Sequence, residues 1–138
     1  MDTSNLMNSA TPVTDAPAVI AIVDADKHQR QSLSRGVSLY GYRCISFATR
    51  GDALGAVSAE NHTVFDVLIV DISSDFNGGL TLVRQMRKCR PGLPIIGIRG
   101  LEWNDRMRCL EAETSKLTVI QRPFTAAALV AEIEKLLK

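Results

Sequence analysis

The chain has 138 residues, of which 46% are hydrophobic, and its 16 Lys plus Arg against 15 Asp plus Glu give a formal net charge of +1. This length and hydrophobic content predict one domain with a substantial core. The balanced charge disfavours a partner held by bulk electrostatics, such as nucleic acid or an anionic membrane surface. The longest apolar run, 16–23, is far shorter than the roughly 20 residues that cross a bilayer.

The first 17 residues differ in composition from the rest of the chain. They are rich in Ser, Thr, Asn, Asp and Pro and show no hydrophobic period, which predicts a flexible arm over 1–17 and a folded domain over 18–138. No basic start followed by a long apolar stretch marks them as a secretory signal. The three cysteines contain no C-x-x-C pair, so neither a disulfide framework nor a zinc site is expected. A cytoplasmic location is therefore expected.

From Ala18 onward, short apolar runs alternate with stretches of helical period. The runs at 18–24, 42–47, 66–71, 95–99 and 117–121 have strand length. Three-to-four spacing of apolar residues follows each of them, at 33–40, 54–57, 80–86, 103–110 and 129–137. The first and third runs are continuously apolar, as in central strands covered on both faces. The pattern predicts an α/β doubly wound, five-stranded parallel sheet flanked by five helices.

Local signals mark several ends of these helices. Asp26 is a candidate cap for the first helix and Thr125 for the last, because short polar side chains accept hydrogen bonds from the first-turn amides. The sequence Arg-Pro-Gly at 90–92 predicts the end of the third helix.

Ionic residues collect where the predicted strands end. Asp24 follows the first strand, Asp71 the third, Arg99 the fourth and Arg122 the fifth. Right-handed crossovers bring these ends to one edge of the sheet, where ligands bind in such folds. Carboxylates at the ends of buried strands are costly unless cations face them. We therefore expect Asp24 to face Asp71, with Arg99 and Arg122 as countercharges.

Over 18–138 the chain resembles the response-regulator receiver domain, the CheY-like fold, whose sheet has the flavodoxin-like order 2-1-3-4-5. The resemblance is carried by "IVDADKHQRQSL" for the acidic first loop, "FDVLIVDISSDFNGGLTLVRQMR" for the acceptor strand and following helix, "PIIGI" for the fourth strand and "QRPF" for a cis-proline-type loop. "GYRCISFATRGDAL" fits the second strand and helix of the family.

The resemblance implies a part in two-component, or phosphorelay, signalling. Asp71 matches the aspartate that accepts a phosphoryl group from a histidine kinase or phosphotransfer protein, and a carboxylate can make this attack when cations neutralise the phosphoryl oxygens. The resemblance further implies Mg²⁺ held by Asp24, Asp71 and the carbonyl of Ser73. It implies no enzyme activity beyond phosphoryl acceptance. A downstream protein partner would bind the surface made by the fourth helix, fifth strand and fifth helix.

Four positions depart from the family pattern. Ala25 stands where the second metal-binding acid is usual, Arg99 where a small hydroxyl residue is usual, and Arg122 where a lysine is usual. Val119 lies where an aromatic switch residue is often found. All four concern the phosphoryl chemistry rather than the fold.

Charge counting predicts how these departures act. The usual three carboxylates and one lysine sum to −2, which suits a divalent cation, whereas Asp24, Asp71, Arg99 and Arg122 sum to zero. We therefore expect weak Mg²⁺ affinity and slow or absent phosphorylation. Asp26 and Asp75 are further candidate ligands, although Asp26 is also explained as a helix cap alone.

Two other functions stay open at this point. A pseudo-receiver would bind its partner without phosphorylation, with Asp71 serving as a structural member of an ion pair. A flavin- or nucleotide-binding protein on a flavodoxin-like sheet is disfavoured, because the loop after the first strand is acidic and the only glycine-rich loop is at 77–79.

Overall fold

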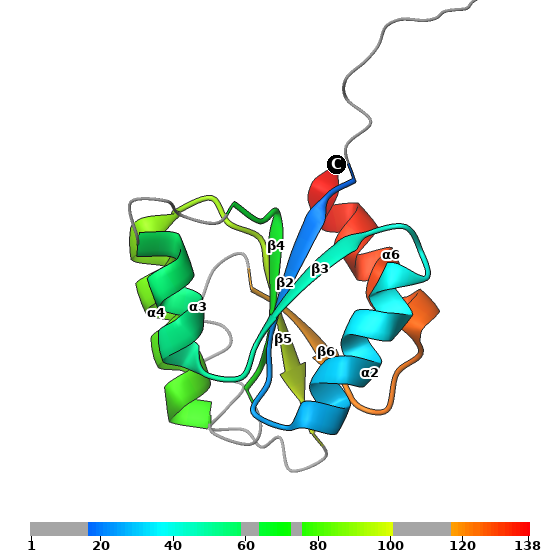
Figure 1. Ribbon diagram of the computed structural model, residues 1–138, viewed down its shortest axis with the longest axis horizontal. Helices are drawn as coiled ribbons and strands as arrows, with labels where there is room; N and C mark the ends of the chain where they lie inside the picture. Colours follow the sequence, from blue (N-terminus) through cyan, green and yellow to red (C-terminus); the bar gives the residue numbers. More distant parts are fainter. Residues whose placement is uncertain (1–16, 59–63, 73–75, 101–116) are drawn as a thin grey trace, which may run out of the picture.

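The computed structural model describes residues 17–58, 64–72, 76–100 and 117–138 (Figure 1). The predicted arm lies outside this part of the chain except for Pro17, so it stays a prediction. The elements, in chain order, are β2 (Val19–Val23), α2 (Lys27–Ser38), β3 (Arg43–Phe47), α3 (Arg50–Ser58), β4 (Val67–Asp71), α4 (Phe76–Cys89), β5 (Ile95–Arg99), β6 (Leu117–Gln121) and α6 (Ala126–Leu137).

The strands form one parallel sheet in the order β3-β2-β4-β5-β6. Numbered along the chain, this is the expected order 2-1-3-4-5. All four strand pairings are parallel, and each strand is joined to the next by a crossover. The fold expected from the sequence is thus confirmed, with all five strands where the apolar runs predicted them.

Helices cover both faces of the sheet, as Figure 1 shows: α3 and α4 lie on one face, and α2 and α6 on the other. These are the four helices in the described ranges. The helix predicted around 103–110 lies outside them. No helix in the described part of the chain is long and apolar enough to cross a membrane.

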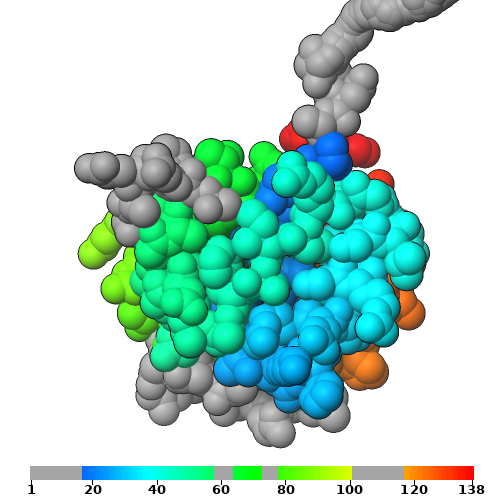
Figure 2. Space-filling view, viewed as in Figure 1, coloured from blue at the N-terminus to red at the C-terminus, as the bar shows by residue number. Residues whose placement is uncertain are grey.

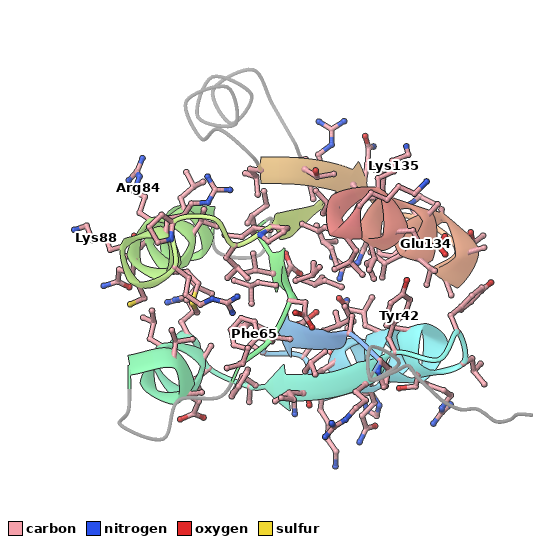
Figure 3. The ribbon with its side chains drawn as sticks, turned by 90° about the horizontal axis from the view of Figure 1, so that it is seen from above. Tyr42, Phe65, Arg84, Lys88, Glu134 and Lys135 are labelled. Atoms are coloured by element: carbon pink, nitrogen blue, oxygen red, sulfur yellow. The ribbon has the colours of Figure 1, made fainter. Side chains whose placement is uncertain are left out.

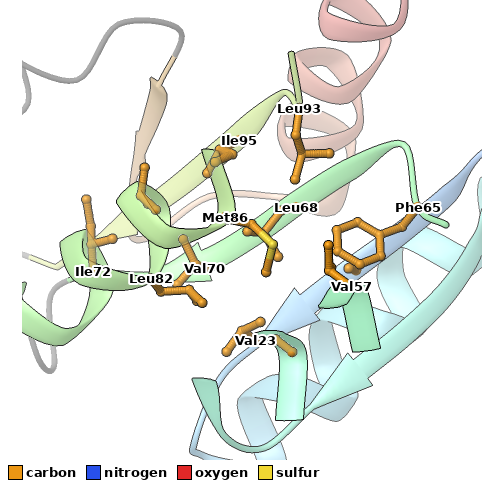
Figure 4. Packing of buried hydrophobic residues seen from close by; sticks show 13 residues of the cluster. Val23, Val57, Phe65, Leu68, Val70, Ile72, Leu82, Met86, Leu93 and Ile95 are labelled. Atoms are coloured by element: carbon orange, nitrogen blue, oxygen red, sulfur yellow. The ribbon is translucent and has the colours of Figure 1, made fainter. Parts of the chain in front are cut away.

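The core consists of two clusters, one on each face of the sheet. Neighbouring residues of β4 alternate between them: Leu68 and Val70 belong to the α3–α4 cluster, and Val67 and Ile69 to the α2–α6 cluster. Side chains of opposite parity along a strand point to opposite faces, so a strand covered on both sides must be apolar throughout. Figure 4 shows the first cluster, with Met86 of α4 beside Leu68 and Val57 of α3 beside Phe65.

Polar contacts fix the end of the sheet where β4 begins. The amide of Val19 donates to Asp66 Oδ2 at 2.7 Å, and the amide of Asp66 donates to the oxygen of Val19 at 2.8 Å. Arg90 donates from Nη1 to the oxygen of Phe65, and its guanidinium lies 5.5 Å from the centre of the Phe65 ring. In Figure 3 Phe65 points into the interior, whereas Arg84 and Lys88 of α4 extend away from the body.

The capping predictions are confirmed, but one helical assignment is wrong. Asp26 accepts from the amide of Gln29 at the start of α2, and Thr125 accepts from the amide of Ala128 at the start of α6. Tyr40, expected on the buried face of the first helix, follows the end of α2 and is half exposed. Gly41 has a φ of +93°, a left-handed conformation typical of residues just past the end of a helix. The chain therefore leaves the helix before Tyr40.

Candidate functional site

The ends of the strands place the predicted ionic residues along one edge of the sheet. Asp71 is the last residue of β4, and Asp24 directly follows β2, the strand beside it. On the other side, Ile98 of β5 pairs with Asp71, so Arg99 lies one residue further along. Arg122 directly follows β6, and its amide donates to the oxygen of Arg99 at 2.9 Å.

The guanidinium of Arg122 joins the two carboxylates. Its Nη1 lies 3.1 Å from Asp71 Oδ2 and its Nη2 lies 3.6 Å from Asp24 Oδ2. The Arg122 side chain is 27% exposed, whereas those of Asp71 and Asp24 are almost covered. The peptide bond between Arg122 and Pro123 is cis. The structure therefore brings together three of the four predicted residues in the expected pairing.

A third partner of this guanidinium comes from α2. Arg122 also donates from Nη2 to Oε1 of Gln29, which lies in the first turn of that helix. Sequence reasoning missed Gln29. Its position three residues after the capping Asp26 places it near the sheet edge, but no local pattern indicates that its side chain reaches the turn after β6.

Asp24 is the one charged residue that is buried among those described, with 5% of its surface exposed. Its Oδ1 accepts from the amide of Asp26 at 2.9 Å, while Arg30 donates to its backbone oxygen at 2.8 Å. Its Oδ2 is buried and accepts no hydrogen bond. Burial raises the pKa of Asp24, and the nearby charge of Asp71 adds to this, against the lowering effects of the Asp26 amide and Arg122.

The described side chains at this edge of the sheet fit the expected Mg²⁺ poorly. Both carboxylates already share Arg122, and Ala25 offers only a methyl group in the first loop. Within the described ranges, no three His, Cys, Asp or Glu side chains are grouped so that they could hold a metal ion. Asp26 uses its side chain to cap α2. The other expected contributors, Ser73 and Asp75, lie outside the described residues.

Arg99 occupies the expected end of β5 and is partly buried. Its backbone oxygen holds the turn that carries Arg122. Its role as a second countercharge to Asp71 stays a prediction. Val119, at the position of the expected switch residue, is partly buried and packs against the α3–α4 cluster.

Comparison with known sequences places this geometry in a family. The sequence profile described as response regulator receiver domain matches residues 20–134. The C4-dicarboxylate transport transcriptional regulatory protein DctD of Rhizobium meliloti is 30% identical over 115 residues, which are 83% of this chain and 24% of that protein. The response regulator MprA of Mycolicibacterium vanbaalenii is 28% identical over 124 residues, 88% of this chain and 51% of that protein. The chain thus spans about a quarter and about half of these relatives.

Solved structures agree with the fold. A CheY-like response regulator receiver domain protein from Methanospirillum hungatei superposes with a TM-score of 0.76 at 25% identity, over 88% of this chain and 94% of the other. The chemotaxis protein CheY4 of Vibrio cholerae gives a TM-score of 0.74 at 21% identity, over 88% of this chain and 99% of the other.

Proposed function

Since the chain belongs to the response regulator receiver domain family, a receiver of two-component signalling, we propose that it is an atypical member in which an arginine takes over charge balance from a metal ion. In this proposal Asp71 is the phosphoryl acceptor and Arg122 neutralises the site. The observation that carries the proposal is the Arg122 guanidinium, 3.1 Å from Asp71 and 3.6 Å from Asp24.

The chemistry requires Asp71 to act as a nucleophile. A carboxylate oxygen of Asp71 attacks phosphorus, a new O–P bond forms, and the bond from phosphorus to the donor breaks with its electron pair leaving on the donor. Arg122 both orients the carboxylate and disperses charge on the product acyl phosphate. Because it also lowers the nucleophilicity of Asp71 by pairing with it, phosphorylation is slow. Mg²⁺ binds weakly because position 25 carries no carboxylate.

The partners follow from the family. The donor is a sensor histidine kinase or a phosphotransfer protein, consistent with likeness to the regulators DctD and MprA. The output partner binds the surface that includes β6 and α6. The fourth predicted helix, which would complete this surface, lies outside the described residues.

A second function is favoured by the same ion pair. If Arg122 stays on Asp71 in the presence of a phosphoryl donor, the domain is a pseudo-receiver that binds its partner without phosphorylation. The Asp71–Arg122 pair then has a structural role, since removing Arg122 leaves the nearly covered charge of Asp71 without this partner.

Intact-protein mass spectrometry after incubation with acetyl phosphate distinguishes these functions. We expect slow addition of one phosphoryl group, with little change when Mg²⁺ is removed by EDTA, and none in Asp71→Asn. Absence of label in the wild type would reject the acceptor role and leave the pseudo-receiver.

Titration calorimetry with Mg²⁺ tests the metal part of the proposal. The wild type is expected to bind Mg²⁺ more weakly than about 1 mM, and Ala25→Asp, which supplies a third carboxylate, about tenfold more tightly than the wild type. Ala25→Asn adds a similar volume without charge and is the matched control. Wild-type binding tighter than millimolar would contradict the proposal.

A further inference from the structure

The side chain of Gln29 joins α2 to the ionic residues at the sheet edge. Gln29 lies in the first turn of α2, and its Oε1 accepts a hydrogen bond from Nη2 of Arg122. Figure 2 shows the segment that follows β6, in orange, at the surface beside α2, in blue and cyan. Gln29 is exposed, so the packing of the core does not require an amide at this position.

The two ends of the Arg122 guanidinium have different partners. Nη1 lies 3.1 Å from Asp71 Oδ2, within hydrogen-bond distance. Nη2 lies 3.6 Å from Asp24 Oδ2, which is too far for a hydrogen bond. Among the residues that the structure describes, Gln29 is therefore the hydrogen-bond acceptor of Nη2. The guanidinium is held by a carboxylate at one end and by a neutral amide at the other, which fixes its direction.

A series of hydrogen bonds fixes the backbone that carries Gln29. The amide of Gln29 donates to Asp26 Oδ1 at 3.0 Å, and the amide of Asp26 donates to Asp24 Oδ1 at 2.9 Å. Arg30, the next residue of α2, donates from Nη1 to the backbone oxygen of Asp24 at 2.8 Å. The start of α2 is thus attached to the loop after β2. Because its backbone is already fixed, the Gln29 side chain loses less conformational entropy when it orients Arg122.

A groove of about 210 Å³ beside this contact gives the Arg122 side chain a second place to lie. The groove is lined by Gln29, Ser32, Leu33, Arg122, Pro123 and Phe124. The Arg122 side chain is 27% exposed, so it can turn toward the groove without crossing the core. A long side chain keeps one position only when its hydrogen bonds outweigh the rotamer entropy that it loses. The hydrogen bond to Gln29 adds to the one from Asp71 and opposes this movement.

We propose that Gln29 is a positioning residue of the acceptor site: by binding Nη2 it keeps the guanidinium of Arg122 on Asp71 and out of the groove. Its effect on Asp71 passes through Arg122. The proposal deepens the function above and rests on it in one respect, that Arg122 supplies the positive charge for phosphoryl transfer to Asp71. The position of the guanidinium itself is measurable without a phosphoryl donor.

NMR of the Arg122 side chain tests this position directly. A guanidinium that donates hydrogen bonds from both Nη1 and Nη2 rotates slowly about the bond between Nε and Cζ, and releasing one end lets it rotate faster. Gln29→Met keeps the length of the side chain but removes the amide, and we expect it to speed this rotation about fivefold. Gln31→Met, which changes another exposed glutamine of α2, is the matched control and should leave the rotation unchanged.

Gln29→Glu tests whether the acceptor oxygen is what matters. It keeps an oxygen at the same reach, so slow rotation of the Arg122 guanidinium should persist. Gln and Met have similar helix propensities, so Gln29→Met and Gln31→Met should unfold at similar temperatures. Rotation in Gln29→Met that equals the wild-type rate would overturn the proposal, and so would fast rotation in Gln29→Glu.

Labelling of Asp71 by acetyl phosphate gives a second measurement. Gln29→Met should slow this labelling about fivefold, because Arg122 then disperses less charge in the transition state, whereas Gln31→Met should not change it. A labelling rate in Gln29→Met equal to or above that of the wild type would overturn the positioning role. A wild type that is never labelled rejects the acceptor role alone, since the rotation of Arg122 is measured without a donor.

Discussion

At the scale of single residues, the guanidinium of Arg122 pairs more closely with Asp71 than with Asp24. Asp71 has Arg122 at 3.1 Å, whereas Asp24 has it at 3.6 Å and keeps a buried oxygen without a hydrogen bond. Burial outweighs the attraction of Arg122 and raises the pKa of Asp24. Ionised Asp24 therefore opposes folding, as functional groups often do.

The sign of this effect predicts how stability depends on pH. A carboxyl whose pKa is higher in the folded state holds its proton more tightly there, so stability is fully present below the unfolded pKa and falls as pH rises through the folded pKa. The difference in unfolding free energy between wild type and Asp24→Asn should therefore shift in favour of the variant as the pH rises from about 3.5 to 7. Urea unfolding at both pH values measures it.

Asp26→Asn is the control for this prediction. Asp26 is exposed and caps α2 through a side chain that asparagine replaces well. If the wild type gained stability relative to Asp24→Asn as pH rose, the pKa of Asp24 would be lowered by folding and the assignment would be wrong.

How far the site could be predicted also depends on single residues. Asp24, Asp71 and Arg122 were predictable because a parallel sheet carries its strand ends to one edge, so their chain positions alone bring them close. Gln29 was not, since its contact depends on two side chains reaching across from different elements. The buried position expected for Tyr40 was wrong because Gly41, not the apolar period, decides where α2 ends.

At the scale of elements, α2 links the site to the α2–α6 cluster. Its first turn holds Arg122 through Gln29, while further along Gly36 meets Ala126 at the start of α6. A Cβ placed on Gly36 would lie 3.1 Å from the Cβ of Ala126, tighter than ordinary contact. The two helices therefore approach closely only because position 36 has no side chain.

We predict that Gly36→Leu lowers the free energy of unfolding by about 1–3 kcal/mol, because a side chain there forces α2 and α6 apart. Gly55→Leu is the matched control: nothing lies within 4 Å of a Cβ at Gly55 of α3. The control should gain roughly 0.5 kcal/mol from the better helix propensity of leucine. Guanidinium unfolding of both variants measures the difference, and equal stabilities would show that the close approach does not limit packing.

At the scale of the whole molecule, two clusters share one sheet. The residues of β4 alternate between them, so neither layer of helices can separate without uncovering this strand. Leu68 and Ile69 are both fully buried, on opposite faces. The two layers should consequently unfold as one unit.

We predict that Leu68→Ala and Ile69→Ala each lower the free energy of unfolding by about 2–5 kcal/mol. Both should keep a single transition, because the shared strand couples the faces. Native-state hydrogen exchange of α3 and α6 amides is the measurement. Loss of protection confined to α3 in Leu68→Ala, with α6 unaffected, would contradict the coupling.

The placement of Asp24, Asp71 and Arg122 at the rim of the sheet has an evolutionary consequence. Each is the last residue of its strand or directly follows one, while the apolar interior is made by the residues before it. Substitutions at the rim therefore leave the packing of the apolar interior unchanged. A descendant can exchange one way of handling charge for another and inherit the same scaffold intact.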